Sequence, residues 1–253
     1  MKSMLKPREG ECHPGGFGPV VGECGDLGCP VGFGSIHQFA ESLGNAVDAK
    51  DPLTFNHSQE VAVFSQELAR AMGFSESVVA HIHVAGHLHD IGKIGIPDAI
   101  LKKRARLSPE ELTWIRRHPE IGARIVGPVT AFAAEGGVGD MILHHHEAYD
   151  GSGYPFGLRG VEIPIGARII AVADTLSALM QDRPYRPGTG LELALSEILG
   201  CAGSQFDPAV VTALERLKEP LQFVSLLRSR SGKEVSHVYS GDRRDGQAAE
   251  TLS

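Results

Sequence analysis

Hydrophobic residues recur with helical spacing along most of the chain, and this periodicity restricts the fold more than any other feature. In residues 35–50, Ile36, Phe39, Leu43 and Val47 fall close to the i, i+3, i+4, i+7 pattern of one helix face. Comparable stripes recur in residues 57–72, 75–90, 108–118, 139–150, 164–180, 190–199 and 207–218. Between residues 36 and 218 no strand-turn-strand pattern competes with them. The sequence therefore predicts an all-α core.

Helix-capping residues mark the beginnings of several of these helices. Ser75 is suited to cap the helix that follows it, and Ser108 precedes Pro109 with Glu111 three residues later, the pattern of a capping box. Asp207 stands before Pro208 in the same way. These residues predict three helix starts.

The two ends of the chain differ from this core. Residues 10–34 contain too much glycine to sustain a long helix or strand, so we expect a loop or a loosely ordered extension there. After Pro220 a short apolar segment could still pack, and beyond Ser229 the composition is that of a frayed tail. We therefore divide the chain into an N-terminal extension (1–35), a helical domain (36–220) and a largely flexible C-terminal segment (221–253).

Composition excludes several classes of protein. A formal charge of -7 argues against a protein that coats a nucleic acid polymer. The sequence has no run of 18 or more apolar residues, so no membrane span is predicted. The N-terminus also lacks the apolar core of a signal peptide. We therefore expect a cytoplasmic protein whose cysteines are reduced thiols. The extension holds four residues that could form a zinc knuckle: Cys12, His13, Cys24 and Cys29. Their spacings lack the usual C-x2-C pairs, so ordinary thiols are favoured for the cysteines.

The adjacent pair His89-Asp90, with Lys93 shortly after it, is the first candidate for chemistry. The pair offers one nitrogen and one oxygen ligand, a mixture that suits Fe, Mn or Zn, and its carboxylate has two oxygens that can bridge two ions. Lys93 would project toward the same side on a continuing helical turn. Taken alone, the pair is better explained as a helix C-terminus, where a cationic histidine is favoured, than as a metal site.

Other polar residues stand at places where such chemistry could be assembled. His57 opens one predicted helix, and His118 closes another before Pro119 starts the next. Asp174 interrupts an apolar helical stretch, and a carboxylate buried there needs a metal, an arginine or backbone donors as its partner. Three consecutive histidines follow residues 139–143. We interpret three other histidines near the pair as a polar helix flank: His81, His83 and His87. His83 and His87 share a helix face, however, and with Asp90 they could imitate another metal site. Trp114 is interpreted as a packing residue.

Three segments together resemble the signature of the HD-GYP family, a branch of the HD metal-dependent phosphohydrolases. They are "HDIGKIGIPDAIL", "HHEAYDGSGYP" and "VADTLSALMQDRPYR", and "GSQFDPAVV" and the stretch around His57 also fit the family pattern. The resemblance covers roughly residues 36–218 and rests on several motifs in the family's order.

The resemblance implies an all-helical domain that holds two, sometimes three, metal ions. Asp90 would bridge two ions, with three residues completing each site: His57, His89 and Asp174 for one, and His118, His145 and His146 for the other. The Glu that holds a third ion in some members is Leu53 here, so two ions are expected. Ser177 replaces an Asp that many relatives have, and we expect this to affect local hydrogen bonding. Fe or Mn is favoured, with Zn, Ni and Co also acceptable.

The implied activity is hydrolysis of cyclic di-GMP to pGpG, and in some members on to GMP. Lys93 would neutralise a phosphate oxygen or assist the leaving group, and the "DRPYR" segment would supply substrate contacts from Arg183, Tyr185 and Arg186. Alternatives are hydrolysis of cyclic GMP-AMP or another nucleotide, or a non-catalytic module that binds cyclic di-GMP or docks a partner. The protein partners would be diguanylate cyclase-type or sensor/receiver proteins, and a homodimer is also compatible with the sequence.

The "DGSGYP" loop is expected to shape the mouth of the site, with Tyr154 beside the substrate. Glu147 and Asp150 would brace this loop, whereas His144 comes one place too early in the motif and would pack beside the site.

Overall fold

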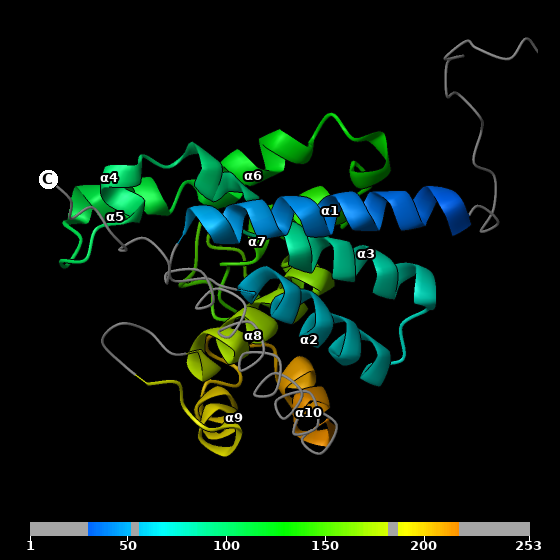
Figure 1. Cartoon of the computed structure of the whole chain (residues 1–253). Coiled ribbons are helices and arrows are strands. Elements are labelled where there is room, and N and C mark those ends of the chain that lie inside the picture. The colour runs from blue at the N-terminus through cyan, green and yellow to red at the C-terminus, as the bar shows by residue number, and fades with distance from the viewer. Residues whose placement is uncertain (1–29, 52–55, 182–186, 218–253) are drawn as a thin grey trace, which may run out of the picture.

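The computed structural model describes residues 30–51, 56–181 and 187–217 of the chain (Figure 1). Within these ranges ten α-helices form, and the only bridge between extended residues is an isolated one that joins Ala202 to Phe206. The helices are α1 (Pro30–Lys50), α2 (His57–Ala71), α3 (Glu76–Leu88), α4 (Asp98–Leu101), α5 (Pro109–Ile115), α6 (His118–Val126), α7 (Val138–His144), α8 (Ile165–Met180), α9 (Leu191–Gly200) and α10 (Pro208–Arg216). Short 3₁₀ segments lie at η1 (Ile91–Gly95), η2 (Thr130–Phe132) and η3 (Gly160–Glu162). The prediction of an all-α fold is confirmed.

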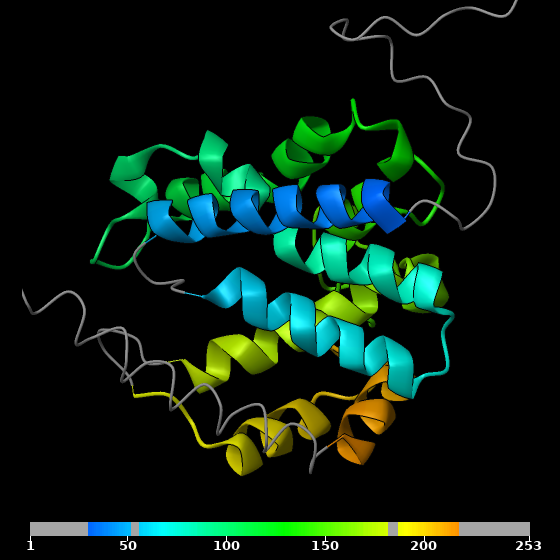
Figure 2. The ribbon, with the colours of Figure 1, turned by 45° about the vertical axis from the view of Figure 1, so that its right-hand side comes forward.

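The centre of the bundle is the stack of α1, α2, α3 and α8. Helix α2 packs against both α3 and α8, and α1 lies across α3, while α9 and α10 close the opposite end (Figures 1 and 2). The buried faces of these helices form one continuous apolar core, with Val61, Ile82 and Ile170 fully buried at its middle. Burial of these apolar stripes is the main force that holds the helices together.

The capping residues behave as predicted at two of the three helix starts. Ser108 and Glu111 form the reciprocal hydrogen bonds of a capping box at α5. Asp207 accepts a hydrogen bond from the Ala209 backbone N–H at α10. Ser75 occupies the cap position of α3, but its side chain makes no capping hydrogen bond.

Two predictions about helix ends were wrong. Helix α1 begins at Pro30, six residues before the predicted start, because proline fits the first turn of a helix and the glycines at 32 and 34 do not stop it. His118 begins α6 instead of closing α5. Trp114 packs, as predicted, but on the surface: it is 43% exposed, and the Arg117 guanidinium lies 4.8 Å from the centre of its ring.

Part of the sequence predictions falls outside the described residues. This holds for the cysteines of the extension, for Leu53, for the "DRPYR" segment from Arg183 to Arg186, and for the C-terminal segment after residue 217. Among the described helices, none combines the length and the apolar character needed to cross a bilayer.

Candidate metal centre

Seven side chains from five separate parts of the chain converge at the middle of the bundle. His57 comes from the first turn of α2, His89 and Asp90 follow α3, His118 opens α6, His145 and His146 follow α7, and Asp174 lies within α8. Five of the seven are almost completely buried, and His146 and Asp174 are partly exposed. These are the residues that the family resemblance named as metal ligands.

The side chains form two groups of three, with Asp90 between them. In the first, called here the Asp174 group, His57 Nε2 lies 3.0 Å and His89 Nε2 4.0 Å from Asp174 Oδ1. In the second, the His118 group, His118 Nε2 lies 3.3 Å from His145 Nε2, and the ring of His146 packs against both.

The two oxygens of Asp90 face different groups. Oδ2 lies 3.3 Å from His89 Nε2, and Oδ1 lies 3.3 Å from His118 Nε2. A carboxylate placed in this way can share its oxygens between two cations. Asp90 therefore lies between the two groups, with one oxygen toward each.

Backbone carbonyls fix the orientation of three of the histidine rings. His89, His118 and His145 each donate from Nδ1 to the carbonyl three residues earlier, over 2.7–2.8 Å. A carbonyl only accepts, so the proton of each neutral ring is on Nδ1 and the Nε2 lone pair points inward.

Ser177 performs the same task for the fourth ring. His57 Nδ1 lies 2.9 Å from Ser177 Oγ, and that hydroxyl donates to a Glu60 carboxylate oxygen 2.6 Å away. The hydroxyl proton is thus used on Glu60, and the oxygen accepts from His57. The departure from the family's Asp at this position therefore preserves an acceptor for the histidine, as expected for an effect on local hydrogen bonding.

This proton arrangement fits bound cations. His118 Nε2 and His145 Nε2 both present lone pairs to each other at 3.3 Å, which is repulsive without a positive charge between them. His89 Nε2 is fully buried and has no hydrogen-bond partner of good geometry within the described residues. Imidazole nitrogens and carboxylate oxygens are together the ligands of Fe, Mn and Zn. The described residues thus carry His/Asp clusters able to hold divalent metal.

The pKa shifts keep most of these ligands in their metal-binding form, and His89 is the exception. Burial lowers the pKa of His146 to about 3, with the neighbouring His118 charge adding to the effect, and it lowers the pKa of His145 and His118 as well. Burial alone would raise the pKa of Asp90, but Lys93 and His89 lower it well below its usual value. Burial likewise opposes the charged form of His89, yet Asp90 raises its pKa to about 9, so a metal that binds there displaces a proton.

Lys93 is tied to the centre from the side of η1. Its ammonium lies 2.8 Å from Asp90 Oδ2 and 3.2 Å from Asp51 Oδ2. Burial favours the neutral amine, but these two carboxylates outweigh it and raise the pKa of Lys93. Lys93 is therefore a cation, and it projects toward the centre as the sequence predicted.

Close backbone packing positions Asp90 and His118 relative to each other. A Cβ atom on Gly92 would lie 1.8 Å from the His118 carbonyl oxygen, so only glycine lets η1 approach α6 this closely. Lys50, from the end of α1, donates to the carbonyls of Lys93, Ile94 and Ile96 and holds η1 from the other side.

The N-terminus of α2 is held by Asp48, which sequence reasoning missed. Asp48 accepts from the backbone N–H and the hydroxyl of Ser58, at 3.0 and 2.8 Å. This cap comes from another helix, α1, and it fixes the turn that carries His57.

The residues after His146 build the rim of the centre. A Cβ on Gly153 would lie 2.1 Å from the Ala148 nitrogen, so the loop crosses directly over the preceding segment. Tyr154 stacks on the His146 ring with 4.9 Å between centroids. The buried Glu147 accepts the N–H groups of the three residues 156–158, as expected of a loop brace.

Two neighbours of this loop also behave as the sequence predicted. The ring of His144 lies beside Phe156, outside both groups, with its Nδ1 3.7 Å from Glu147. Asp150 caps the turn by accepting from the Ser152 N–H.

A pocket of about 300 Å³ opens onto the His118 group. Its walls include Tyr154, His146, Asp174, Thr175 and Arg116. The Arg116 guanidinium lies 5.3 Å from the centre of the Tyr154 ring. Arg116 was not predicted as a site residue; its position two residues before His118 was the one available signal.

Comparison with known proteins agrees with this geometry. A family model described as the HD domain matches residues 41–210. The chain is 39% identical to a cyclic di-GMP phosphodiesterase from Thermotoga maritima over 80% of its own length and 54% of that protein. It is also 39% identical to the cyclic di-GMP phosphodiesterase response regulator RpfG of Xanthomonas campestris, over 71% of this chain and 47% of the other. A 3'3'-cGAMP-specific phosphodiesterase from Vibrio cholerae shares 39% identity over 64% and 37% of the two chains.

Solved structures support the fold. A cyclic GMP-AMP specific phosphodiesterase from V. cholerae superposes with a TM-score of 0.58 at 20% identity, covering 75% of this chain and 50% of that one. An "HDGYP" protein from Bdellovibrio bacteriovorus gives a TM-score of 0.55 at 20% identity, covering 73% and 64%. The chain spans about half the length of the two cyclic di-GMP phosphodiesterases named above, 54% and 47%.

Proposed function

The chain belongs to the HD domain family, and from that premise we propose that it is a dinuclear-metal phosphodiesterase that opens cyclic di-GMP to pGpG. The observation that carries the proposal is the placement of Asp90, with one oxygen toward the Asp174 group and the other toward the His118 group. None of the seven ligand positions is lost, which argues against a non-catalytic module. The names of the similar proteins, which are cyclic di-GMP and 3'3'-cGAMP phosphodiesterases, support the substrate class.

The proposed ligand set consists of the two groups and Asp90. Bound divalent ions supply Lewis-acid polarisation of a phosphodiester and make a nucleophile available from water at neutral pH. The residues of the chain hold the ions, and the carbonyl and Ser177 hydrogen bonds keep the lone pairs of four of the five imidazoles directed inward. Two carboxylates among five histidines favour Fe or Mn, and Zn, Ni or Co would also fit. We propose two ions and not three, because Leu53 has no ligand atom.

Lys93 is proposed to stabilise charge at the reacting phosphate. An ammonium group has three N–H donors, and two of them are directed at Asp90 and Asp51. The third can reach a phosphate oxygen held at the centre. Because its carboxylate neighbours keep Lys93 protonated, it acts as a fixed cation or as a proton donor to the leaving oxygen, and not as a base.

Substrate recognition is assigned to the rim. Tyr154 offers a ring face in the pocket, and Arg116 beside it places a guanidinium where a second phosphate or a base could bind. We add Arg183, Tyr185 and Arg186 to the proposed contacts on the basis of the sequence alone. Cyclic GMP-AMP is the second candidate substrate, favoured by the similarity to the V. cholerae enzyme, and further cleavage to GMP remains part of the proposal.

The biological setting is proposed from the family resemblance. We propose a cytoplasmic protein that works in second-messenger signalling with diguanylate cyclase-type or sensor/receiver partners, as a monomer or a homodimer. The "DGSGYP" loop lies at the rim of the pocket, and its turn from Asp150 to Ser152 is exposed, so a partner that docks on it would affect substrate access.

The test is hydrolysis by purified protein loaded anaerobically with Mn or Fe. Cyclic di-GMP and 3'3'-cGAMP are incubated separately, and the products are separated by chromatography. We expect cleavage of cyclic di-GMP, and loss of that cleavage in Asp90→Ala. No cleavage of either dinucleotide with either metal would refute the enzymatic proposal. Full activity in Asp90→Ala would refute the ligand assignment.

A further inference from the structure

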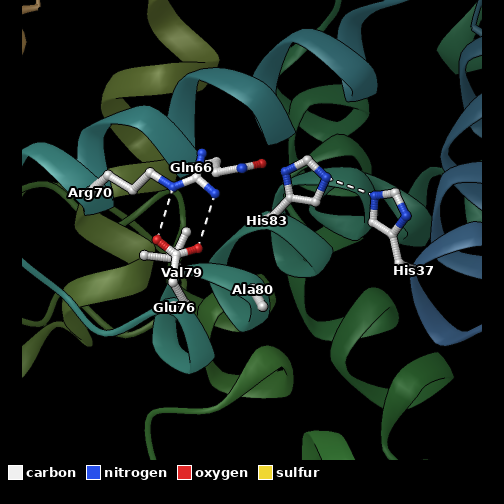
Figure 3. Close-up of a pocket in the computed structure, with 7 residues that line it drawn as sticks. All are labelled: His37, Gln66, Arg70, Glu76, Val79, Ala80 and His83. Atoms are coloured by element: carbon white, nitrogen blue, oxygen red, sulfur yellow. Dashed lines mark hydrogen bonds and ion pairs between the residues drawn. The ribbon is translucent and has the colours of Figure 1, made fainter. Parts of the chain in front are cut away.

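Three histidines outside the metal centre converge between α1 and α3. His37 lies on α1, and His83 and His87 lie one turn apart on α3. His83 Nε2 is 2.8 Å from His37 Nε2 and 3.2 Å from His87 Nε2. One nitrogen from each ring lies within 4.8 Å of the other two. Figure 3 shows His37 and His83 facing each other from different helices.

Hydrogen bonds among the three rings cannot satisfy all of their converging nitrogens. In one arrangement the proton of His83 is on Nδ1 and is donated to the Ala62 carbonyl, 3.1 Å away, which leaves only a lone pair on His83 Nε2. That one lone pair faces two other Nε2 atoms. A cation among the three nitrogens would use one lone pair from each ring.

The hydrogen bonds of Gln66 favour a second arrangement of the protons on His83, the one expected when no cation is bound. With its amide nitrogen turned toward His83, it donates to Nδ1 over 2.7 Å, while its oxygen accepts from Arg70 over 2.7 and 2.9 Å. His83 then carries its proton on Nε2 and donates it to His37. The cluster thus has two proton arrangements, and a bound cation would select the one in which His83 Nδ1 donates to Ala62.

We propose that His37, His83 and His87 form a zinc site, separate from the metal centre, that links α1 to α3. Three imidazoles without a carboxylate suit Zn²⁺ better than Mn²⁺ or Mg²⁺. Zn–N bonds of about 2.0–2.1 Å place neighbouring nitrogens of a tetrahedral site roughly 3.3 Å apart. The observed separations of 2.8 and 3.2 Å come within about half an ångström of that geometry. The fourth ligand is water.

The surroundings allow an ion to enter. His37 and His83 line a surface pocket of about 320 Å³ (Figure 3), and His87, whose Nε2 lies 3.2 Å from His83 Nε2, is only 1% exposed. Arg70 also lines this pocket, but the positive charge of its guanidinium is offset by ion pairs with Glu67 and Glu76, each at 3.0 Å. The site therefore has water access and no uncompensated positive neighbour at Arg70.

The position of the site indicates a structural role. A Cβ on Gly44 would lie 2.7 Å from the His87 carbonyl oxygen, so α1 and α3 are in backbone contact there. His87 precedes His89 by two residues on the segment that leads into the metal centre. A zinc ion on His37, His83 and His87 would brace the helix that delivers the His-Asp pair. This inference does not depend on the proposed phosphodiesterase activity.

Zinc stoichiometry tests the site directly. The full-length chain, His37→Ala and His81→Ala are stripped of metal, equilibrated with Zn²⁺ and freed of excess ion, and bound zinc is then measured. His37 is half-buried on a helix, where alanine is well tolerated, and His81 is the matched control on α3 outside the cluster. We expect His37→Ala to hold about one zinc equivalent less than the wild-type chain and His81→Ala to match it.

Thermal unfolding gives a second readout that does not depend on counting ions. Zn²⁺ should raise the Tm of the wild-type chain and of His81→Ala by more than it raises the Tm of His37→Ala, because only the first two can link α1 to α3 through the metal. Equal zinc content and equal Zn²⁺-dependent shifts in all three proteins would show that the cluster is held by hydrogen bonds alone and would overturn the proposal.

Discussion

Gly92→Ala should damage the metal centre without touching any proposed ligand. The new Cβ would lie 1.8 Å from the His118 carbonyl oxygen and 2.6 Å from the Gly122 nitrogen. Both are backbone atoms, so neither can move aside alone. To reach the 3.4 Å limit of ordinary contact, η1 and α6 must separate by about 1.6 Å.

That separation is large compared with the tolerance of a metal site. Ligand distances in such sites are held to within about 0.2 Å, and His118 stands 3.3 Å from Asp90 across this very contact. Overpacking of this kind costs about 1–3 kcal/mol, which lowers the Tm of a domain this size by roughly 2–12 °C. We therefore expect a lower Tm and the loss of about one bound Mn or Fe ion per chain from the side of His118.

The assay combines differential scanning calorimetry with metal analysis after anaerobic loading. Gly200→Ala is the matched control, because a Cβ at Gly200 meets nothing within 4 Å. The control should keep both the Tm and the metal content of the wild-type chain. If Gly92→Ala also kept both, the conclusion that this backbone contact positions His118 against Asp90 would be wrong.

Three further substitutions test how the residues around the centre act. Ser177→Ala removes the acceptor for His57 Nδ1 and should weaken metal binding by roughly 10–100-fold in a chelator competition, whereas an unchanged affinity would contradict that positioning role. Glu147→Gln removes the charge that accepts three loop N–H groups and should cost about 1–3 kcal/mol in urea unfolding; a change near zero would show that the loop does not need it. Arg116→Ala should raise the KM for cyclic di-GMP roughly tenfold with metal content and kcat little changed, and a fall in kcat alone would argue against a binding role beside Tyr154.

The sequence predicted the parts of the fold that depend on local signals. Ser108 and Glu111 cap α5 as their spacing indicated, because a capping box needs only residues of one turn. The start of α1 was not predicted, because the glycine-rich residues 10–34 favoured a loop and Pro30, which opens the helix, lies among them. Trp114 was predicted to be a packing residue, and it packs on the surface, because Arg117 lies beside its ring there.

The residues of the candidate centre that lie within the family motifs could be predicted from the sequence. Contacts between residues far apart in the sequence could not be predicted in the same way. His57, His118 and Asp174 converge although the sequence separates them widely, and only the resemblance indicated this. Asp48 and Arg116 lie outside the motifs, so their contacts depend on how the helices pack. His37 is 46 residues from His83, and no local pattern connects the two, which explains why His83 was interpreted as part of a polar flank.

The dependence of turnover on metal stoichiometry tests the central claim most directly. Metal-free protein is titrated with Mn²⁺ under anaerobic conditions, and the initial rate of cyclic di-GMP cleavage is measured after each addition. Because Asp90 faces both groups, we expect little activity at about one equivalent and full activity only near about two equivalents. A rate that reached its maximum at one equivalent, or that did not depend on metal at all, would contradict it.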